Sequence, residues 1–112
     1  MASGTVQPLP KTAIPLPMKE IEAFCRKWGV KEFALFGSVL RDDFEADSDV
    51  DVLLDLVDDP ERSPDYAFEM YDELTSMFGR KIDLVERFWL MRSQNPYRKQ
   101  QILESARVIH AN

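Results

Sequence analysis

Residues 49–56 read DVDVLLDL, a stretch in which carboxylate and aliphatic side chains alternate. Successive side chains of a β-strand point to opposite faces of the sheet, so this alternation predicts a strand. One face carries Val50, Val52, Leu54 and Leu56. The other face carries Asp49, Asp51 and Asp55. We therefore expect one face of this strand to pack into a core while the other presents carboxylates.

The carboxylates of this strand are candidate metal ligands. Asp49 and Asp51 lie on the same face, roughly 6 to 7 Å apart along the backbone, close enough to bind a common pair of cations. Asp83, on a predicted strand over residues 81–86, completes a cluster of three if the two strands are neighbours. Oxygen ligands favour Mg²⁺ or Mn²⁺ over zinc. The alternative is the solvated face of an edge strand, where charge guards against aggregation.

A second candidate feature is the pair Gly37 and Ser38, which follows a predicted strand over residues 31–36. A glycine lets the backbone approach phosphate oxygens, and a serine at a helix start offers its hydroxyl and a free N–H. Arg41, one turn further along, can supply a cation to the same phosphates. Taken alone, a Gly-Ser pair is also an ordinary turn, and Arg41 an ordinary surface partner of the aspartates that follow it.

The remaining periodicities predict helices. Apolar residues at helical spacing favour helices over residues 18–28, from Ser63 as N-cap to Gly79, and over residues 96–109. With the strands and a short helix capped by Ser38, the element order is α-β-α-β-α-β-α. This order predicts an α/β (α+β) sandwich around a small sheet.

Size and composition limit the organisation of the chain. Its 112 residues predict one domain over residues 18–112, and the four prolines of residues 1–17 predict an extended arm before it. A net charge of −6 disfavours a nucleic-acid partner. No apolar stretch is long enough for a bilayer and no secretory signal is present, so we expect a cytoplasmic protein. We expect Cys25 to pack in the core and His110 to lie in a frayed terminus.

The spacing of these residues resembles a known signature. The chain carries Gly37 and Ser38, then ten residues, then Asp49, Val50 and Asp51. This run is similar to the G-S-x10-D-x-D pattern of the DNA polymerase beta nucleotidyltransferase superfamily. With Arg41, and with Asp83 in Lys-Ile-Asp-Leu-Val, residues 18–109 look like the minimal nucleotidyltransferase branch. Leu40 and Asp42 depart from it, since relatives usually carry a small residue and a glycine there.

The resemblance implies a nucleotidyltransferase fold, with helices packed on a small mixed sheet. It implies that Asp49 and Asp51 hold two Mg²⁺ ions and that Gly37, Ser38 and Arg41 bind the triphosphate of ATP. Asp83 would be the third ligand and would activate the acceptor hydroxyl. Small members of the family are commonly antitoxins that adenylylate a tyrosine of an HEPN-fold toxin, so a hetero-oligomer with such a toxin is implied.

Two alternatives stay open at this point. The chain could neutralise a toxin by binding alone, or it could transfer a nucleotide to a small molecule such as an aminoglycoside. The complete set of three carboxylates favours activity, and the absence of a substrate domain disfavours the small molecule. A basic bias in the C-terminal quarter is either a solvated face or a contact with an acidic partner or the nucleotide. Its residues are Arg87, Arg92, Arg98, Lys99 and Arg107.

Overall fold

The computed structural model describes residues 9–111 of the chain. Its elements are α1 (Met18–Trp28), β1 (Val30–Phe36), the 3₁₀ helix η1 (Gly37–Leu40), β2 (Val50–Leu56), α2 (Tyr66–Phe78), β3 (Ile82–Glu86), α3 (Arg87–Met91), α4 (Pro96–Ser105) and β4 (Arg107–Ala111). The predicted α/β class is confirmed. Within the described residues, every helix is too short or too polar to span a bilayer.

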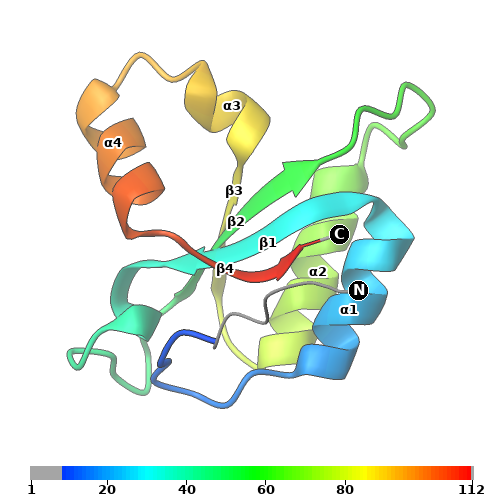
Figure 1. Ribbon diagram of the computed structural model, residues 1–112. Helices are drawn as coiled ribbons and strands as arrows, with labels where there is room; N and C mark the ends of the chain where they lie inside the picture. Colours follow the sequence, from blue (N-terminus) through cyan, green and yellow to red (C-terminus); the bar gives the residue numbers. More distant parts are fainter. Residues whose placement is uncertain (1–8, 112) are drawn as a thin grey trace, which may run out of the picture.

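The four strands form one mixed sheet in the order β3-β2-β1-β4 (Figure 1). β1 pairs antiparallel with both β2 and β4, whereas β2 and β3 run parallel. A parallel pair needs a crossover connection, and α2 provides it between β2 and β3. This pairing makes β2 and β3 direct neighbours, which is the condition for Asp83 to lie near Asp49 and Asp51.

The main core lies between one face of the sheet and the pair α1 and α2, which lie side by side in Figure 1. Val50, Val52 and Leu54 are fully buried in this core, as the alternation predicted. The helices contribute their periodic apolar residues Ile21, Phe24, Cys25, Met70 and Leu74. An ion pair of 2.7 Å between Lys27 Nζ and Glu73 Oε2 links the two helices at the surface.

The opposite face of the sheet is also covered, which the alternation of β2 did not predict. Leu53, on the same face as the aspartates, is 6% exposed and packs with Ala34, Phe36, Leu90 and Ile102. Leu90 belongs to α3 and Ile102 to α4, so these helices form a second layer over the carboxylate face. The aspartates therefore lie at the border of a small second core.

Two predicted helix boundaries are wrong. The closing helix ends at Ser105 rather than Ile109, because residues 107–111 extend as β4 and pair with the outer edge of β1. His110 lies opposite Phe33 in this pairing and is not in a frayed end. Helix α2 begins at Tyr66, after a turn in which Ser63 Oγ accepts a hydrogen bond from the N–H of Asp65, 3.3 Å away, so Ser63 is not the N-cap.

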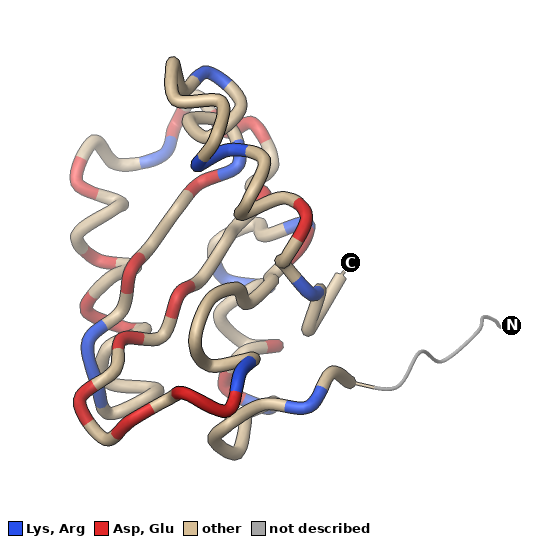
Figure 2. Tube along the Cα trace, turned by 90° about the vertical axis from the view of Figure 1, so that its left-hand side faces the viewer, with Lys and Arg blue, Asp and Glu red and all other residues tan. Residues whose placement is uncertain are grey.

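Charge is unevenly distributed over the elements (Figure 2). Residues 87–107, which cover α3 and α4, hold five Lys and Arg residues and one carboxylate, Glu104. The loop between η1 and β2 has the opposite character, with Asp42, Asp43, Glu45, Asp47 and Asp49. The carboxylate face of the sheet thus lies between an acidic loop and a basic helical layer.

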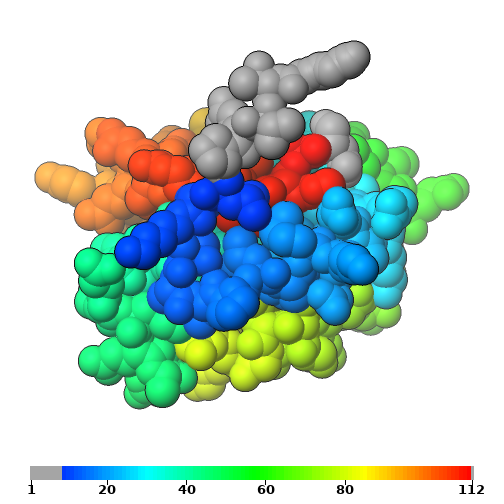
Figure 3. All heavy atoms as spheres, turned by 60° about the horizontal axis from the view of Figure 1, so that its bottom comes forward, coloured from blue at the N-terminus to red at the C-terminus, as the bar shows by residue number. Residues whose placement is uncertain are grey.

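The segment before α1 belongs to the body of the molecule over the residues that the structure describes. Residues 9–17 form neither helix nor strand, and Ile14 and Leu16 pack against the main core. The N–H of Ala13 donates to the carbonyl oxygen of Val39 at 2.7 Å. Figure 3 shows this segment, in dark blue, lying on the surface beside β4 and α1. The first part of the predicted arm, residues 1–8, lies outside the described residues.

Candidate active site

The parallel register of β2 and β3 brings two of the predicted site residues together. Asp51 lies directly opposite Asp83 in this pairing. Opposite residues of adjacent strands point to the same face, so both carboxylates project toward the layer formed by α3 and α4. Asp49 lies just before β2, two residues from Asp51 and so on the same face, and it is exposed. The three aspartates therefore gather at one end of β2.

The turn after β1 lies against the same carboxylates. Phe36, the last residue of β1, is opposite Asp51, and Gly37 follows it with φ of +76°. A side chain at Gly37 would overlap the carboxylate of Asp51, so this position needs glycine both for its backbone angle and for space. Ser38 follows in η1 and is half-buried. Gly37 is thus in contact with Asp51, and the turn that it begins is not remote from the aspartates.

Burial and the neighbouring carboxylates raise the pKa of Asp51 from 3.8 to about 6. Burial is the largest cause, and the negative charges of Asp83 and then Asp49 add to it. Two cations, Arg41 and Arg98, lower the pKa of Asp51. Asp51 is the central carboxylate of the group, since it is close enough to respond to both of the others.

Arg41 borders this group from the side of η1. Its backbone N–H donates to the carbonyl oxygen of Ser38 at 2.9 Å, which ends the 3₁₀ turn. Its guanidinium is exposed and bonds Asp43, with 3.1 Å between Nε and Oδ1. The surface pairing considered from the sequence is therefore present, although the charge of Arg41 still acts on Asp51.

Arg98 borders the group from the opposite layer; from the sequence it was one of five basic residues that form either a solvated face or a contact with an acidic partner or the nucleotide. It lies on α4, and its Nη2 atom is 3.7 Å from Oδ2 of Asp83. The cap of α4 was visible in the sequence, since Asn95 and Pro96 suit the start of a helix. No local signal could show that this helix turn would lie beside β3, because the contact depends on how α4 packs on the sheet.

The three aspartates offer the kind of oxygen atoms that a hard divalent cation prefers, but their side chains are not arranged to hold one. Three carboxylates at one end of a parallel pair are the oxygen donors that Mg²⁺ and Mn²⁺ prefer. Even so, no three carboxylate, imidazole or thiol groups of residues 9–111 are arranged so that they could hold a metal ion. Asp83 also lies beside Arg98, with 3.7 Å between Oδ2 and Nη2. Asp49, Asp51 and Asp83 therefore fit a metal by type and register, and their side chains must rearrange to hold one.

Asp55 shares the face of Asp51 but does not belong to this group. It lies four residues further along β2, where its Oδ1 atom is 3.8 Å from Nζ of Lys31. It lines the edge of a hollow of about 580 Å³ instead. Asp55 therefore has a structural position, paired with Lys31 beside the hollow.

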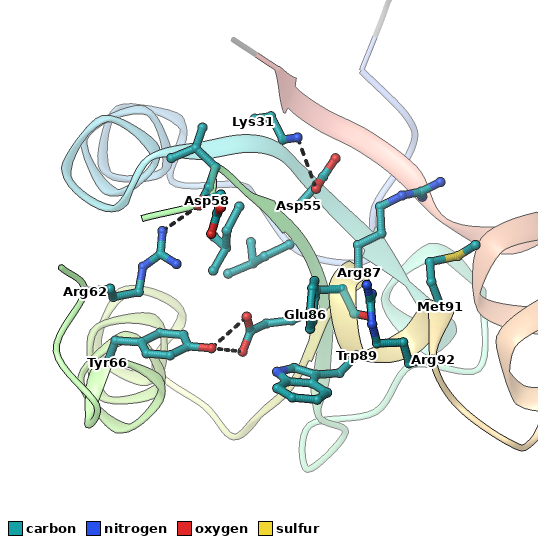
Figure 4. A pocket seen from close by; sticks show the side chains of 14 residues that line it. Lys31, Asp55, Asp58, Arg62, Tyr66, Glu86, Arg87, Trp89, Met91 and Arg92 are labelled. Carbon is teal, nitrogen blue, oxygen red and sulfur yellow. Dashed lines mark hydrogen bonds and ion pairs between the residues drawn. The ribbon is translucent and has the colours of Figure 1, made fainter. Parts of the chain in front are cut away.

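That hollow lies at the other end of β2 and β3 and contains none of the predicted site residues (Figure 4). Tyr66 donates its hydroxyl hydrogen to Glu86, with oxygen separations of 2.7 and 2.9 Å, and burial raises the pKa of Tyr66. The Arg62 guanidinium stacks over the Tyr66 ring at 5.2 Å. Because Glu86 is already bonded to Tyr66, and Arg62 to the carbonyl oxygen of Val57, we regard the aspartate group as the better candidate for chemistry.

Comparison with known proteins identifies the family of the chain. Residues 18–109 match the family described as nucleotidyltransferase domain. A candidate protein adenylyltransferase of Methanocaldococcus jannaschii is 38% identical over 80 residues, which cover 70% of this chain and 74% of the relative. Protein adenylyltransferase MntA of Thermococcus cleftensis is 33% identical over 78 residues, which cover 62% and 77%.

Two solved structures share the fold at lower identity. A toxin–antitoxin complex with AMP-PNP has a TM-score of 0.65 at 21% identity and covers 87% of this chain and 75% of that one. A complex of a tri-AMPylated Shewanella oneidensis HEPN toxin with an MNT antitoxin has a TM-score of 0.57 at 21% identity, with coverages of 84% and 69%. At this identity the likeness establishes a common architecture.

Proposed function

This chain belongs to the nucleotidyltransferase domain family, and from that premise we propose that it transfers AMP from ATP to a protein hydroxyl. The relatives named protein adenylyltransferases support a protein as the acceptor. The structural likeness to toxin–antitoxin complexes supports an HEPN-type toxin as the partner, and the family resemblance favours a tyrosine of that toxin. In this proposal the chain is an antitoxin that works in the cytoplasm, where ATP is available.

One observation carries the proposal: Asp51 lies opposite Asp83 while its carboxylate fills the space beside Gly37. Gly37 begins η1. Backbone N–H groups of the Gly-Ser turn therefore lie next to the end of β2 and β3 that carries Asp51 and Asp83. Such N–H groups bind phosphate oxygens, while carboxylates bind the cations that accompany a triphosphate. The two halves of a nucleotide-transfer site are therefore adjacent.

In the proposed reaction the acceptor hydroxyl oxygen attacks the α-phosphorus of ATP. A new oxygen–phosphorus bond forms, and the bond from the α-phosphorus to the bridging oxygen breaks, so pyrophosphate leaves. The hydroxyl proton passes to a carboxylate, and Asp83 is our candidate because β3 is an edge strand that a partner protein can approach. Ser38 and Arg41 bind the triphosphate, and Arg41 exchanges Asp43 for a phosphate oxygen.

Metal binding is assigned to the three aspartates in this proposal. Mg²⁺, or Mn²⁺ in its place, supplies positive charge that stabilises the entering and leaving oxygens when bound. Asp49 and Asp51 lie on the same face at the start of β2, and Asp83 lies beside Asp51 on β3. Their mutual repulsion, which contributes to the raised pKa of Asp51, is relieved when a cation binds among them.

The test is label transfer from ATP. We would incubate the protein with Mg²⁺, ATP labelled at the α-phosphorus and the product of the neighbouring gene, and then separate the proteins. We expect label on the partner, and at least about a 100-fold loss of labelling in the double variant Asp49→Asn, Asp51→Asn, since removal of metal-binding charges abolishes transition-state stabilisation. Asp55→Asn is the matched control, because Asp55 lies on the same face of β2 but pairs with Lys31.

Neutralisation of the toxin separates catalysis from binding. If the double variant still protects cells from the partner as well as the unmodified chain does, the protein neutralises by complex formation and the enzymatic proposal is wrong. Label on an added aminoglycoside, with none on the partner, would instead identify a small-molecule acceptor. Full labelling in Asp55→Asn excludes a general loss of charge as the cause of inactivity.

A further inference from the structure

Arg98 is held at a defined place by the start of α4. The side-chain oxygen of Asn95 accepts a hydrogen bond from the Arg98 N–H at 3.2 Å, and Pro96 occupies the first turn. Further along, Ile102 is 4% exposed and packs with Leu53 and Phe36 of the sheet. The cap and this buried contact fix α4 against the carboxylate face, so its first turn lies beside β3.

From this turn, Arg98 reaches the carboxylate that the metal site needs. Its Nη2 atom is 3.7 Å from Oδ2 of Asp83, and the two side chains are 51% and 44% exposed. A pair that is half exposed contributes little to folding stability. The pair has a different effect on metal binding. Asp83 cannot bind the Arg98 guanidinium and a divalent metal ion equally well, and the positive charges of the guanidinium and the metal ion repel each other.

We propose that Arg98 is a positioning residue that competes with the metal ion for the Asp83 carboxylate. The proposal rests on the function proposed above, since it takes Asp83 as a metal ligand. Among the described residues the three aspartates are not arranged to hold a metal ion, and the contact of Asp83 with Arg98 is one interaction that a bound cation must displace. Arg98 therefore weakens metal binding in the absence of nucleotide, and it acts through Asp83.

The test is Mn²⁺ binding to the full chain without nucleotide, measured by electron paramagnetic resonance of the free ion. We expect Arg98→Gln to bind Mn²⁺ roughly three- to tenfold more tightly than the unmodified chain, as expected for removal of one competing cation a few ångströms away in a screened, partly exposed site. Arg98→Lys should restore weaker binding. A purely structural role for Arg98 would make binding weaker in Arg98→Gln.

The matched control is Lys99→Gln, which removes the same charge from the next residue of α4. Consecutive helical residues point about 100° apart, so this variant tests whether net charge alone is responsible. We expect its Mn²⁺ affinity to stay within about twofold, as for a screened surface charge. Equal tightening in Lys99→Gln and Arg98→Gln would overturn the proposal, and so would no tightening in Arg98→Gln.

A double-variant cycle separates this inference from the proposed function. Asp83→Asn should weaken Mn²⁺ binding, and Arg98→Gln should tighten binding much less in the Asp83→Asn background, where only its effect on Asp51 remains. If Asp83→Asn binds Mn²⁺ as well as the unmodified chain, Asp83 is not a ligand and the proposed site is wrong. If Asp83→Asn binds more weakly but Arg98→Gln tightens binding equally in both backgrounds, only the positioning role is overturned. Thermal unfolding by circular dichroism confirms that each variant folds.

Discussion

At the scale of single residues, Gly37 is the position with the strictest requirement. Its φ of +76° is unfavourable for other residues, and the Asp51 carboxylate occupies the place of a side chain. We expect Gly37→Ala to lower the free energy of unfolding by about 1 to 3 kcal/mol, the usual cost of a strained backbone angle. Labelling should fall at least about 100-fold, because the Gly-Ser turn must shift away from the aspartates. Urea unfolding and label transfer measure the two effects.

Gly79 provides the control for this substitution. It has a similar backbone angle, with φ of +68°, but a side chain there would meet no atom within 4 Å. Gly79→Ala should therefore cost about 1 kcal/mol of stability and leave labelling unchanged. Equal labelling by Gly37→Ala and Gly79→Ala would show that the contact between Gly37 and Asp51 is irrelevant to transfer.

The raised pKa of Asp51 predicts a dependence of stability on pH. Its pKa is about 6 in the folded chain and 3.8 for an ordinary aspartate, so between these values the folded state holds a proton that the unfolded state has lost. By linkage, this group makes the folded state less stable as pH rises from about 4 to 6. In metal-free buffer, Asp51→Asn should therefore be more stable than the unmodified chain at pH 7.

The same comparison at low pH supplies the check. The advantage of Asp51→Asn in urea unfolding should shrink as pH falls from about 6 and vanish below about 3, where the aspartate is protonated in both states. Addition of Mn²⁺ at pH 7 should stabilise the unmodified chain more than the variant. A variant that is less stable than the unmodified chain at pH 7 would contradict the pKa assigned to Asp51.

At the scale of elements, β4 is the strand whose contribution is easiest to isolate. It pairs with the outer edge of β1, and its residue Ile109 is 5% exposed in the main core. We expect Ile109→Ala to lower the free energy of unfolding by about 2 to 4 kcal/mol, as is usual for a buried aliphatic side chain. Val108→Ala, on the opposite face at 47% exposure, should cost less than about 1 kcal/mol. Equal effects would mean that β4 does not pack into the core.

At the scale of the whole molecule, the packing of α1 and α2 on one face of the sheet leaves Cys25 out of contact with solvent. Its side chain is fully buried in the main core, and burial, followed by the charge of Glu22, raises its pKa to about 11. The reactive thiolate is therefore scarce at pH 8. We expect a disulfide reagent to modify Cys25 at least about 1,000-fold more slowly in the folded chain than in urea, because modification requires global unfolding.

The dependence of this reaction on urea provides the check. If Cys25 becomes accessible only on global unfolding, the modification rate should rise with urea in proportion to the unfolded fraction measured by circular dichroism. A rate that is insensitive to urea below the unfolding transition would show a local opening of α1 instead. The rate of Cys25 modification also reports whether the main core of each variant above stays inaccessible to the reagent.

Local patterns in the sequence determined much of this protein. The alternation in residues 49–56 predicted β2, and Gly29 and Gly79, both in left-handed conformations, end α1 and α2 as expected. The alternation also separated the aspartates from the aliphatic residues. These features follow from side-chain direction and backbone preference within a few residues, so a single sequence is enough to predict them.

Only the tertiary structure decided how the distant parts meet. Which strands pair determined that Asp51 faces Asp83 and that residues 107–111 form β4 rather than the end of a helix. The packing of α4 on the second face brought Arg98 to Asp83. Each of these contacts joins residues that no short period in the sequence relates, because they depend on the free energy of the whole packed sheet rather than on local preference.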